Sequence, residues 1–584
     1  MTGAGLRLAA TVPVAIPLLW AGALSCSPFD APVKPTSRVL LPPRTGGPSA
    51  RLFAALTTTL RRAQRDLSGP GKERPLFLAA AASESRLHDA QFSLGQVVDR
   101  SRVRQQWVYG LVRVGSHRLD SASGAGHPSE AARLPFPPDA LAVGRVLLPA
   151  LERSHRWSVK RLSGTRTWLR KHPLTARPAA WTAARPVSSI ARAPRPRRPS
   201  RRHGAALRLA SAVFRHYPDI HESWVILRAA TWSIHTVTSE SARLYRDGEA
   251  LSVGIRARTR APDGARVELL WQWQHADPRR LPTAAALSRR AAELARLTLR
   301  LRTAPLARKE YAGPVLFEGR AAAAVLLQTV GMRLTANRSS MYSDHRVTAD
   351  GLIGQPVLPT WLSVVDDPTA SRWGKLTLLG GYPVDDEGTP ARRVTLVSKG
   401  TLRSLLGSRQ PSRSLRRSTG HGRALDQALH IRALPSNLLF LPERPLSRAG
   451  LRRRFLELLR SRKLPHGYIV RQVLHEQPRP GYRSRKIAWY LARPSLVYRV
   501  DASGRETLVR GYGAIRTVRP MAVLPPMVAM GGPPEVAHWL LGSGNWISVV
   551  SRGFILDDTR LVQAAQPMYK PPQLPPPLRA AGRP

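Results

Sequence analysis

Cysteine is the scarcest residue of this sequence. Cys26 is the only one among 584 residues, so no disulfide can form within the chain. This excludes a small secreted domain held together by disulfides. Acidic residues are also scarce, with 37 Asp and Glu against 91 Lys and Arg. Nearly all of the positive charge is arginine, and with many Ala, Pro and Leu residues this also fits a GC-rich coding bias at surface positions, so the net charge of +54 does not by itself indicate nucleic-acid binding.

Long apolar runs are rare as well. An uncharged run over Leu8–Leu24 follows Arg7 and predicts a signal peptide over residues 1–26. The tetrapeptide ALSC, which ends at Cys26, resembles a bacterial lipobox, and cleavage before Cys26 would leave a lipidated cysteine. The alternatives are an ordinary signal peptide and an uncleaved anchor. We therefore expect an exported protein, either periplasmic or anchored to a membrane as a lipoprotein, and no second membrane span.

Acidic residues are absent from the whole segment between Arg153 and Pro218. Within it we place a basic, Pro-rich insertion near residues 171–204, which we interpret as solvated because it offers little apolar surface to bury. The alternative is a surface-bound polycationic protein that uses residues 160–202 to bind anionic lipid or nucleic acid. We favour the first interpretation and do not expect nucleic acid as a partner.

The rest of the chain has the pattern of a two-domain α+β protein. Helical and strand patterns alternate over residues 51–305 and predict an N-terminal α/β domain with a mixed sheet and helices. Hairpin patterns dominate residues 306–566 and predict a predominantly β C-terminal domain. Pro-rich sequence flanks the two domains, as a tether over residues 27–50 and a tail over residues 567–584.

Periodicity also locates the individual elements. Apolar residues at helical spacing predict helices over residues 51–67, 140–169, 205–215, 281–302 and 446–463, with Thr283 as the N-cap of the fourth. Alternation and turn residues predict strands in the first domain over residues 75–79, 91–98, 106–114, 223–234, 241–246, 251–260 and 267–273. The same signals predict two hairpins in the second domain, 392–397 with 401–406 and 495–500 with 506–510.

Several segments resemble the TldD/PmbA family of peptidases. In the first domain they are RVLLPALERSHRWSVKRL, LRLASAVFRHYPDIHESWVILR and SESARLYRDG. In the second they are YAGPVLFEGRAAAAVLL, SVVDDPT, GYPVDDEGTPARRVTLVSKGTLRSLL, STGHGRA and LVYRVDASGRETLVRG, of which the block GYPVDDEGTPARRVTLV is the most specific. The resemblance spans most of the chain after the signal peptide. It implies the fold of this family, usually assembled as a two-subunit peptidase whose enclosed cleft holds extended peptides through their backbones.

The resemblance also implies a zinc site whose ligands this sequence lacks. In the family's catalytic subunit, two histidines of a His-Glu-x-x-x-His helix and a distant cysteine bind zinc, and the glutamate accepts a proton from the attacking water. On AVLLQTVGMRL these helix positions fall on Leu327, Gln328 and Met332, and the third ligand falls near Leu540. Leucine has no donor atom, glutamine cannot act as a base, and zinc rarely uses a thioether. We therefore expect no bound zinc and no other cofactor.

The residues that replace the zinc helix are informative in themselves. The stretch AAAAVLLQTV is apolar on nearly all sides, which predicts a helix buried in the core. Gly331, which follows it, predicts a helix end beside a narrow space.

Other metal-ligand candidates are weak. Pro218 separates His216 from His221 and breaks the helix that would bring both onto one face, so we interpret them as ordinary surface or core histidines. Asp344 and His345 follow the altered helix without a visible third ligand.

Two acidic clusters and one histidine segment remain. The clusters Asp366–Asp367 and Asp385–Glu387 lie in turns typical of the family, where we expect capping and backbone contacts. The resemblance places STGHGR near the cleft, which implies that His421 and Arg423 contact a peptide backbone. A structural role in the turn is the alternative.

These observations favour a catalytically inactive TldD/PmbA-like protein. It would bind extended peptides or serve as the partner of a catalytic, zinc-bearing subunit, and a homodimer is a further possibility. The alternatives are an active metallopeptidase with a non-standard metal site and the surface-bound polycation described above.

Overall fold

The computed structural model describes most of the chain after the tether. The described residues are 48–122, 129–135, 139–172, 178–183, 187–190, 201–307, 309–337, 349–424, 429–474, 490–491, 493–517, 526–541 and 544–564. The predicted signal peptide with Cys26, nearly all of the tether, and the tail lie outside these residues.

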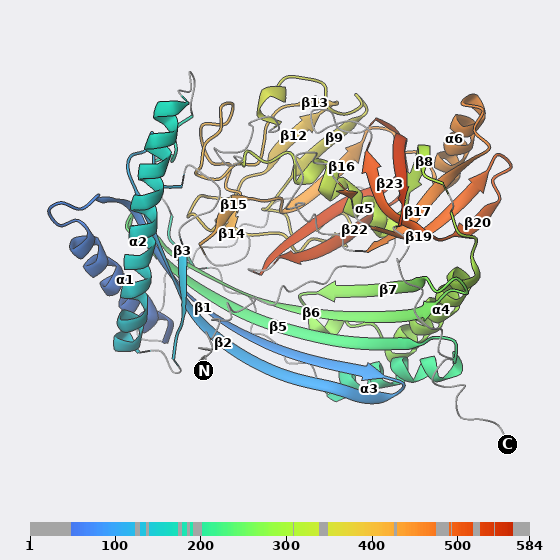
Figure 1. Cartoon of the computed structure of the whole chain (residues 1–584), viewed down its shortest axis with the longest axis horizontal. Coiled ribbons are helices and arrows are strands. Elements are labelled where there is room, and N and C mark those ends of the chain that lie inside the picture. Colours follow the sequence, from blue (N-terminus) through green and yellow to red (C-terminus); the bar gives the residue numbers. More distant parts are fainter. Residues whose placement is uncertain are drawn as a thin grey trace, which may run out of the picture.

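Seven strands among the described residues form the first sheet, in the order β3-β2-β1-β5-β6-β4, with β7 also paired to β6. All pairs are antiparallel except that of β4 with β6. Figure 1 shows the four long strands β2, β1, β5 and β6 curving together beneath the rest of the molecule. The strands are β1 (Pro75–Ser93), β2 (Gln96–Val114), β3 (Ser129–Arg133), β4 (Ser189–Ile190), β5 (Glu222–Thr238), β6 (Arg243–Arg260) and β7 (Arg266–His275).

The long strands correct two of our predictions. Leu94 and Gly95, with φ of 49° and 77°, form the turn between β1 and β2, so the predicted strand over residues 91–98 is wrong. Two consecutive residues with positive φ are usually Asn-Gly or Asp-Gly, and a leucine gives no such signal. The predicted strands 241–246 and 251–260 are a single strand, β6.

Helices cover the first sheet at two places and build two cores. Helices α1 and α2 pack on β1 and β2, whereas α3 and α4 pack on β5, β6 and β7 (Figure 1). The Thr283 hydroxyl accepts the Ala286 N–H at 3.3 Å, which confirms the predicted N-cap of α4. The helices are α1 (Pro48–Leu67), α2 (Ala140–Lys171), α3 (Arg201–Ala212) and α4 (Ala284–Thr303), with 3-10 turns at Val213–His216 and Pro278–Arg280.

The second sheet has twelve strands among the described residues, and β23 lies at its centre. Strand β23 pairs with β16, β8, β22 and β21, while β17, β19 and β20 extend the sheet beyond β8. The two helices of this domain are α5 (Gly319–Leu326) and α6 (Arg448–Ser461), and Ala349–Leu352 is a 3-10 turn. The strands of this sheet are β8 (Tyr311–Phe317), β9 (Leu362–Asp366), β12 (Val394–Ser398), β13 (Thr401–Leu402), β16 (Asn437–Pro442), β17 (His466–Leu474), β18 (Tyr490–Leu491), β19 (Arg493–Asp501), β20 (Glu506–Val509), β21 (Tyr512–Thr517), β22 (Met527–Leu541) and β23 (Asn545–Gln563).

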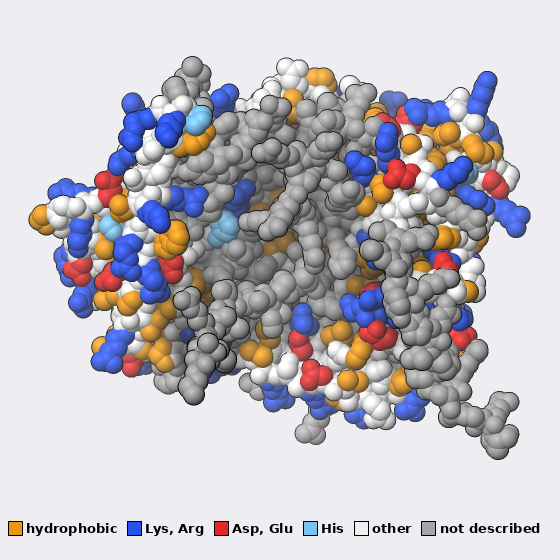
Figure 2. Space-filling model, viewed as in Figure 1, with side chains coloured by type: hydrophobic (Ala, Val, Ile, Leu, Met, Phe, Trp, Pro, Cys, Tyr) orange, Lys and Arg blue, Asp and Glu red, His pale blue; other side chains and the backbone are white. Residues whose placement is uncertain are grey.

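Two small hairpins complete the fold, which is the predicted α+β class with a β-rich second domain. They pair β10 (Arg372–Trp373) with β11 (Leu376–Thr377), and β14 (Gly422–Ala424) with β15 (Ile431–Ala433). Figure 2 shows lysine and arginine side chains at both ends of the visible face, over α1 and α2 and over α6. Among the described helices, none has the length and apolar character needed to cross a bilayer.

Part of the basic insertion is buried where the two domains meet. The Trp181 ring is 5% exposed and lies between two guanidinium groups, with Arg113 Cζ 3.8 Å and Arg409 Cζ 4.4 Å from its centroid. Arg409 forms a bidentate ion pair with Glu240 at 2.5 and 2.8 Å and donates to the Thr182 carbonyl. The interpretation of residues 171–204 as solvated is therefore wrong for this stretch, because Trp181 joins arginines of both domains.

Trp181→Ala should lower the free energy of unfolding by about 3–5 kcal/mol, because it empties a buried site and leaves two arginines without their ring. The measurement is the urea midpoint followed by circular dichroism. The matched control is Trp157→Ala on α2, where the ring is 58% exposed and truncation should change the midpoint little. Equal losses in the two variants would refute a joining role for Trp181.

Candidate functional site

The segment predicted to replace the zinc helix is α5 together with a π-helical turn over Leu327–Gly331. All residues from 321 to 331 are buried, and the helix packs against β17, β22 and β23. Its threonine hydroxyl, on Thr329, donates to the Val325 carbonyl at 2.7 Å, which satisfies that polar group inside the core. The prediction of a buried helix is confirmed.

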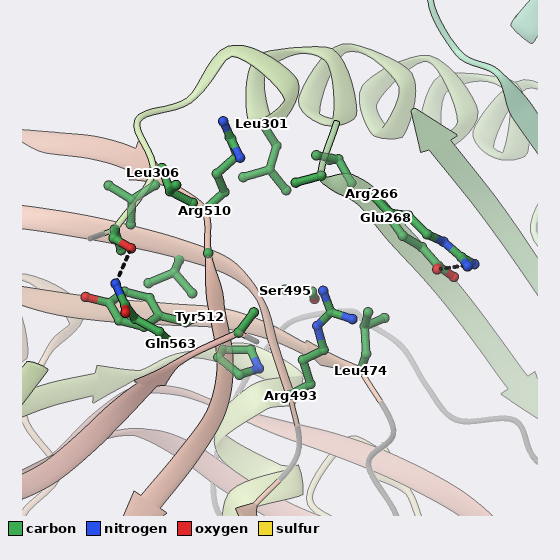
Figure 3. Close-up of a pocket in the computed structure, with 18 of the residues that line it drawn as sticks. Arg266, Glu268, Leu301, Leu306, Leu474, Arg493, Ser495, Arg510, Tyr512 and Gln563 are labelled. Atoms are coloured by element: carbon green, nitrogen blue, oxygen red, sulfur yellow. Dashed lines mark hydrogen bonds and ion pairs between the residues drawn. The ribbon is translucent and has the colours of Figure 1, made fainter. Parts of the chain in front are cut away.

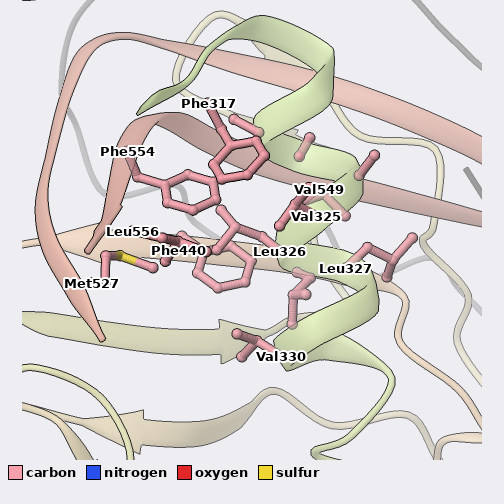
Figure 4. Close-up of a cluster of buried hydrophobic side chains, with 14 of the residues drawn as sticks. Phe317, Val325, Leu326, Leu327, Val330, Phe440, Met527, Val549, Phe554 and Leu556 are labelled. Atoms are coloured by element: carbon pink, nitrogen blue, oxygen red, sulfur yellow. The ribbon is translucent and has the colours of Figure 1, made fainter. Parts of the chain in front are cut away.

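The helix is surrounded by apolar side chains on more than one side. Figure 4 shows Leu326 on the side of the stacked rings of Phe317 and Phe554, whose centroids are 5.2 Å apart, while Leu327 lies on the opposite side. Leu327 is nevertheless only 4% exposed and belongs to the same buried cluster. At Gly331 an added Cβ would lie 2.7 Å from Leu438 Cδ2, so the predicted narrow space beside the helix end is confirmed.

The four positions that the resemblance assigns to the zinc site carry none of the side chains that usually bind zinc. Leu327 and Leu540 are each 4% exposed, Gln328 is 6% exposed, and Met332 is partly buried against the main core. Leu540 lies on β22, one of the strands that α5 contacts. Zinc needs imidazole, thiolate or carboxylate donors around an open position, whereas the helix places apolar side chains in a filled core. These residues do not fit zinc.

Of the weaker metal candidates, His216 and His221 lie among the described residues. His216 is exposed at the end of a 3-10 turn, whereas His221 Nδ1 lies 3.1 Å from the Thr259 hydroxyl. Asp344 and His345 lie outside the described residues. No three His, Cys, Asp or Glu side chains cluster in metal-binding geometry within the described ranges.

The acidic turn Asp385–Glu387 is buried and holds its surroundings through backbone hydrogen bonds. Asp385 accepts the N–H groups of Glu387, Thr389 and Gly422 at 3.0, 2.8 and 2.9 Å. Glu387 accepts the Arg409 N–H at 2.6 Å. The expected capping and backbone contacts are confirmed for this cluster, and they fix the position of β14, which begins at Gly422.

The peptide-binding candidates His421 and Arg423 flank Gly422 and point into the protein. His421 is fully buried, with Nε2 3.1 Å from an Asp366 carboxylate oxygen. Arg423 is 8% exposed, its Cζ lies 3.9 Å from the Tyr382 ring centroid, and it binds Asp386 at 3.3 Å. Contacts of this kind are expected if His421 and Arg423 have a structural role in the turn, which is the alternative given above to peptide binding. Contact of either residue with a peptide stays a prediction.

The structure brings in residues of the first sheet that sequence reasoning missed. Arg246 on β6 pairs with Asp386 at 3.2 Å and donates to the Asn545 side chain at 2.6 Å. Arg423 also donates to Asn545, so one amide joins arginines of both domains. The Trp232 ring lies against Gly544, where a Cβ would overlap it. No local sequence pattern marks these residues, because their partners are about 140 or more positions away.

Burial controls the protonation of this network. It raises the pKa of Asp385 to about 8, with a further contribution from Glu387, and raises the pKa of Glu387 to about 7. For Asp386 burial acts in the same direction, but Arg246 and Arg423 outweigh it and hold the pKa below the ordinary value. The folded network therefore retains a proton near neutral pH that an unfolded carboxylate would release.

Part of the sequence matches a known family model, and the fold resembles solved structures. The model of the PmbA/TldA metallopeptidase C-terminal domain matches residues 309–487. TldE from Thermococcus kodakarensis superposes with a TM-score of 0.56 at 12% identity, over 87% of this chain and 100% of that chain. Two proteins described as modulators of DNA gyrase give similar values. The one from Thermotoga maritima has a TM-score of 0.55 at 13% identity, over 87% of this chain and 100% of its own. The one from Bacteroides thetaiotaomicron has 0.54 at 11%, over 88% and 98%.

No curated protein matches the sequence. The structural neighbours share the fold over 87–88% of this chain, and the family model matches within the β-rich domain that contains α5 and the acidic turn. The match of residues 309–487 to this family model, together with the fold shared with TldE and the two modulator-of-gyrase proteins, supports membership of the TldD/PmbA family.

As the pH rises through neutral toward 8 the protein should lose stability, because the Asp385–Glu387 pair must release a proton that the unfolded chain has already lost, and the decline should end above about pH 8. Desolvation lowers the pKa of His235 to about 4 and that of His538 to about 3, so the contribution of these histidines to stability is lost only as the pH falls below about 6.5. The window from pH 7 to 8.5 therefore isolates the carboxylates. Glu387→Gln should flatten the decline in melting temperature across this window.

The control is Glu293→Gln, which alters an exposed glutamate on α4 and should leave the decline as in the wild type. Parallel declines in the wild type and in Glu387→Gln would contradict the shared-proton interpretation.

Proposed function

We propose that this protein is a non-catalytic member of the TldD/PmbA family, which binds extended peptides or acts as the partner of a zinc-bearing subunit. The observation that carries the proposal is the burial of Leu327 and its neighbours in the core at the position of the zinc helix. Burial of one leucine side chain contributes roughly 1.5–3 kcal/mol to the free energy of folding. The altered positions therefore stabilise the fold instead of binding a metal ion.

The partner role has support in the family itself. As the resemblance implies, one subunit of the usual two-subunit peptidase also lacks the metal motif, so loss of the ligands is compatible with a place in such a complex. A homodimer is the alternative assembly. The superposition on TldE supports only the shared fold, and the choice of partner is part of the proposal.

Strand β7 supports peptide binding. Within the described sheet β7 pairs with β6 alone, which leaves its second edge able to accept an added strand. One carbonyl on β7, that of Leu270, already accepts a hydrogen bond from the Gln472 side chain of the second domain. A peptide along β7 would therefore lie where the two domains face each other (Figure 1).

Export and anchoring complete the proposal. We place the mature chain outside the cytoplasm, tethered through a lipid on Cys26. The mass of the mature N-terminal peptide tests this directly, because an acylated cysteine at position 26 supports the anchor and an unmodified chain that begins elsewhere contradicts it.

The purified chain alone should contain far less than one zinc per molecule and should not hydrolyse an unstructured peptide. Mixed with a relative from the same organism that keeps the His-Glu-x-x-x-His motif, it should form a complex, and hydrolysis should depend on that relative's zinc. Metal analysis, size-exclusion chromatography and a peptide assay make the three measurements.

Stoichiometric zinc in the chain alone, with hydrolysis abolished by a chelator, would favour the alternative of an active peptidase with a non-standard site. Leu327→Ala in the isolated chain is a useful second check. It should lower stability by about 2–5 kcal/mol without changing metal content.

A further inference from the structure

A cavity of about 850 Å³ lies where the two domains face each other. One wall comes from β6, β7 and the end of α4, and the other comes from β19, β21 and the segments next to them. Its volume falls within the range of small-molecule sites, roughly 300–1,000 Å³. None of its lining residues belongs to α5, so the cavity is separate from the altered zinc positions.

The first wall carries more arginine than its carboxylates can balance. Three guanidinium groups, those of Arg256, Arg258 and Arg266, surround the carboxylate of Glu268 at 3.2, 3.1 and 3.1 Å, and a second carboxylate, that of Glu222, pairs with Arg258 at 2.7 Å. The buried Nε atoms of Arg256 and Arg258 have no acceptor in hydrogen-bond geometry. Burial lowers the pKa of Arg256 although carboxylates oppose it, which agrees with incomplete compensation. This wall therefore favours an additional anionic group.

The opposite wall carries Arg493, a cation that has no ion-pair partner among the described residues. Arg493 on β19 lines the cavity, is exposed, and makes no side-chain hydrogen bond or ion pair in the described part of the chain. Arg510, which lies next to β21, is in contrast paired with Asp263 at 2.7 Å. Figure 3 shows Arg493 beside Ser495 and Leu474, with Arg510 and Leu301 across the cavity from it. Arg493 is thus the available ligand for an anion.

Part of the lining is apolar, beside the polar side chains of Ser495, Tyr512 and Gln563. Leucine and valine side chains from both domains contribute to it, namely those of Leu301, Leu306, Leu474, Val497 and Val509. An occupant that satisfies both parts of the lining has an apolar body and one anionic end. A dianionic phosphate fits less well, because the Asp263 and Glu268 carboxylates also line the cavity and would repel its second charge.

We propose that this interdomain cavity binds a small amphipathic carboxylate, whose carboxylate pairs with Arg493 and whose apolar part contacts Leu301, Leu306 and Val497. Guanidinium and carboxylate match in a planar, bidentate arrangement, which makes arginine well suited to this role. Two sources share this chemistry, the C-terminal residue of a peptide and a free aliphatic acid. The proposal does not depend on whether the chain is a peptidase, a partner subunit or neither.

Isothermal titration of the full mature chain tests the site with four probes: acetyl-alanyl-leucine, its C-terminal amide, octanoate and octanol. The two carboxylates should bind more tightly than their neutral analogues by about tenfold or more, which is the effect of one charge-assisted hydrogen-bonded pair. Binding of the peptide acid alone would identify a peptide C-terminus as the source. Binding of octanoate alone would identify a free acid.

Arg493→Met keeps the length of the aliphatic side chain and removes the charge, so it should weaken carboxylate binding by about tenfold or more and leave the neutral analogues unchanged. Arg444→Met, at another exposed arginine that does not line the cavity, is the matched control and should bind like the wild type. Arg493→Lys should keep part of the affinity. The proposal is overturned if neither acid binds at millimolar concentration, if acids and neutral analogues bind equally, or if Arg493→Met binds like the wild type.

Discussion

The close packing of α5 against β17, β22 and β23 is the constraint on which the C-terminal domain depends. Strand β8 leads directly into this helix, and β23 pairs with four other strands of the same sheet. The side chains of the helix belong to the main core, and Gly331 in the turn that follows packs against Leu438 on β16. A catalytic zinc ion needs the opposite arrangement, with polar ligands and an open coordination position. One segment cannot satisfy both requirements, and in this structure α5 is part of the core.

A second constraint sets how the domains meet. The junction is made by buried charges and aromatic rings, with Trp181 between two arginines and Asp386 between Arg246 and Arg423. Buried ion pairs lose much of their Coulomb energy to desolvation, so their main effect is to define one arrangement of the partners. Fixing the domains in this way also defines the cavity between them, because its two walls belong to different domains.

Sequence reasoning succeeded where a local pattern determined the outcome. The helical period and the N-cap residue Thr283 predicted the position of α4. The continuous apolar stretch after Gly319 predicted a buried helix, because a helix without a polar face has to be covered on all sides. The same reasoning failed at Leu94, where the turn residue is an unusual one, and at Trp181, whose Pro- and Arg-rich neighbourhood is typical of solvated segments. It also gave no sign of the cavity, since Arg493 and Arg256 are far apart in the sequence and meet only through the fold. Contacts of this kind depend on tertiary structure, which neither periodicity nor composition records.

The central claim is that the former zinc helix is now part of the hydrophobic core. Its most direct test is Leu327→His, which restores one ligand of the family's motif, with the melting temperature measured with and without equimolar zinc. The account predicts a loss of about 2–5 kcal/mol, from the lost apolar contacts and the buried imidazole, that zinc does not reverse. A variant as stable as the wild type, with a melting temperature that rises on addition of zinc, would contradict it.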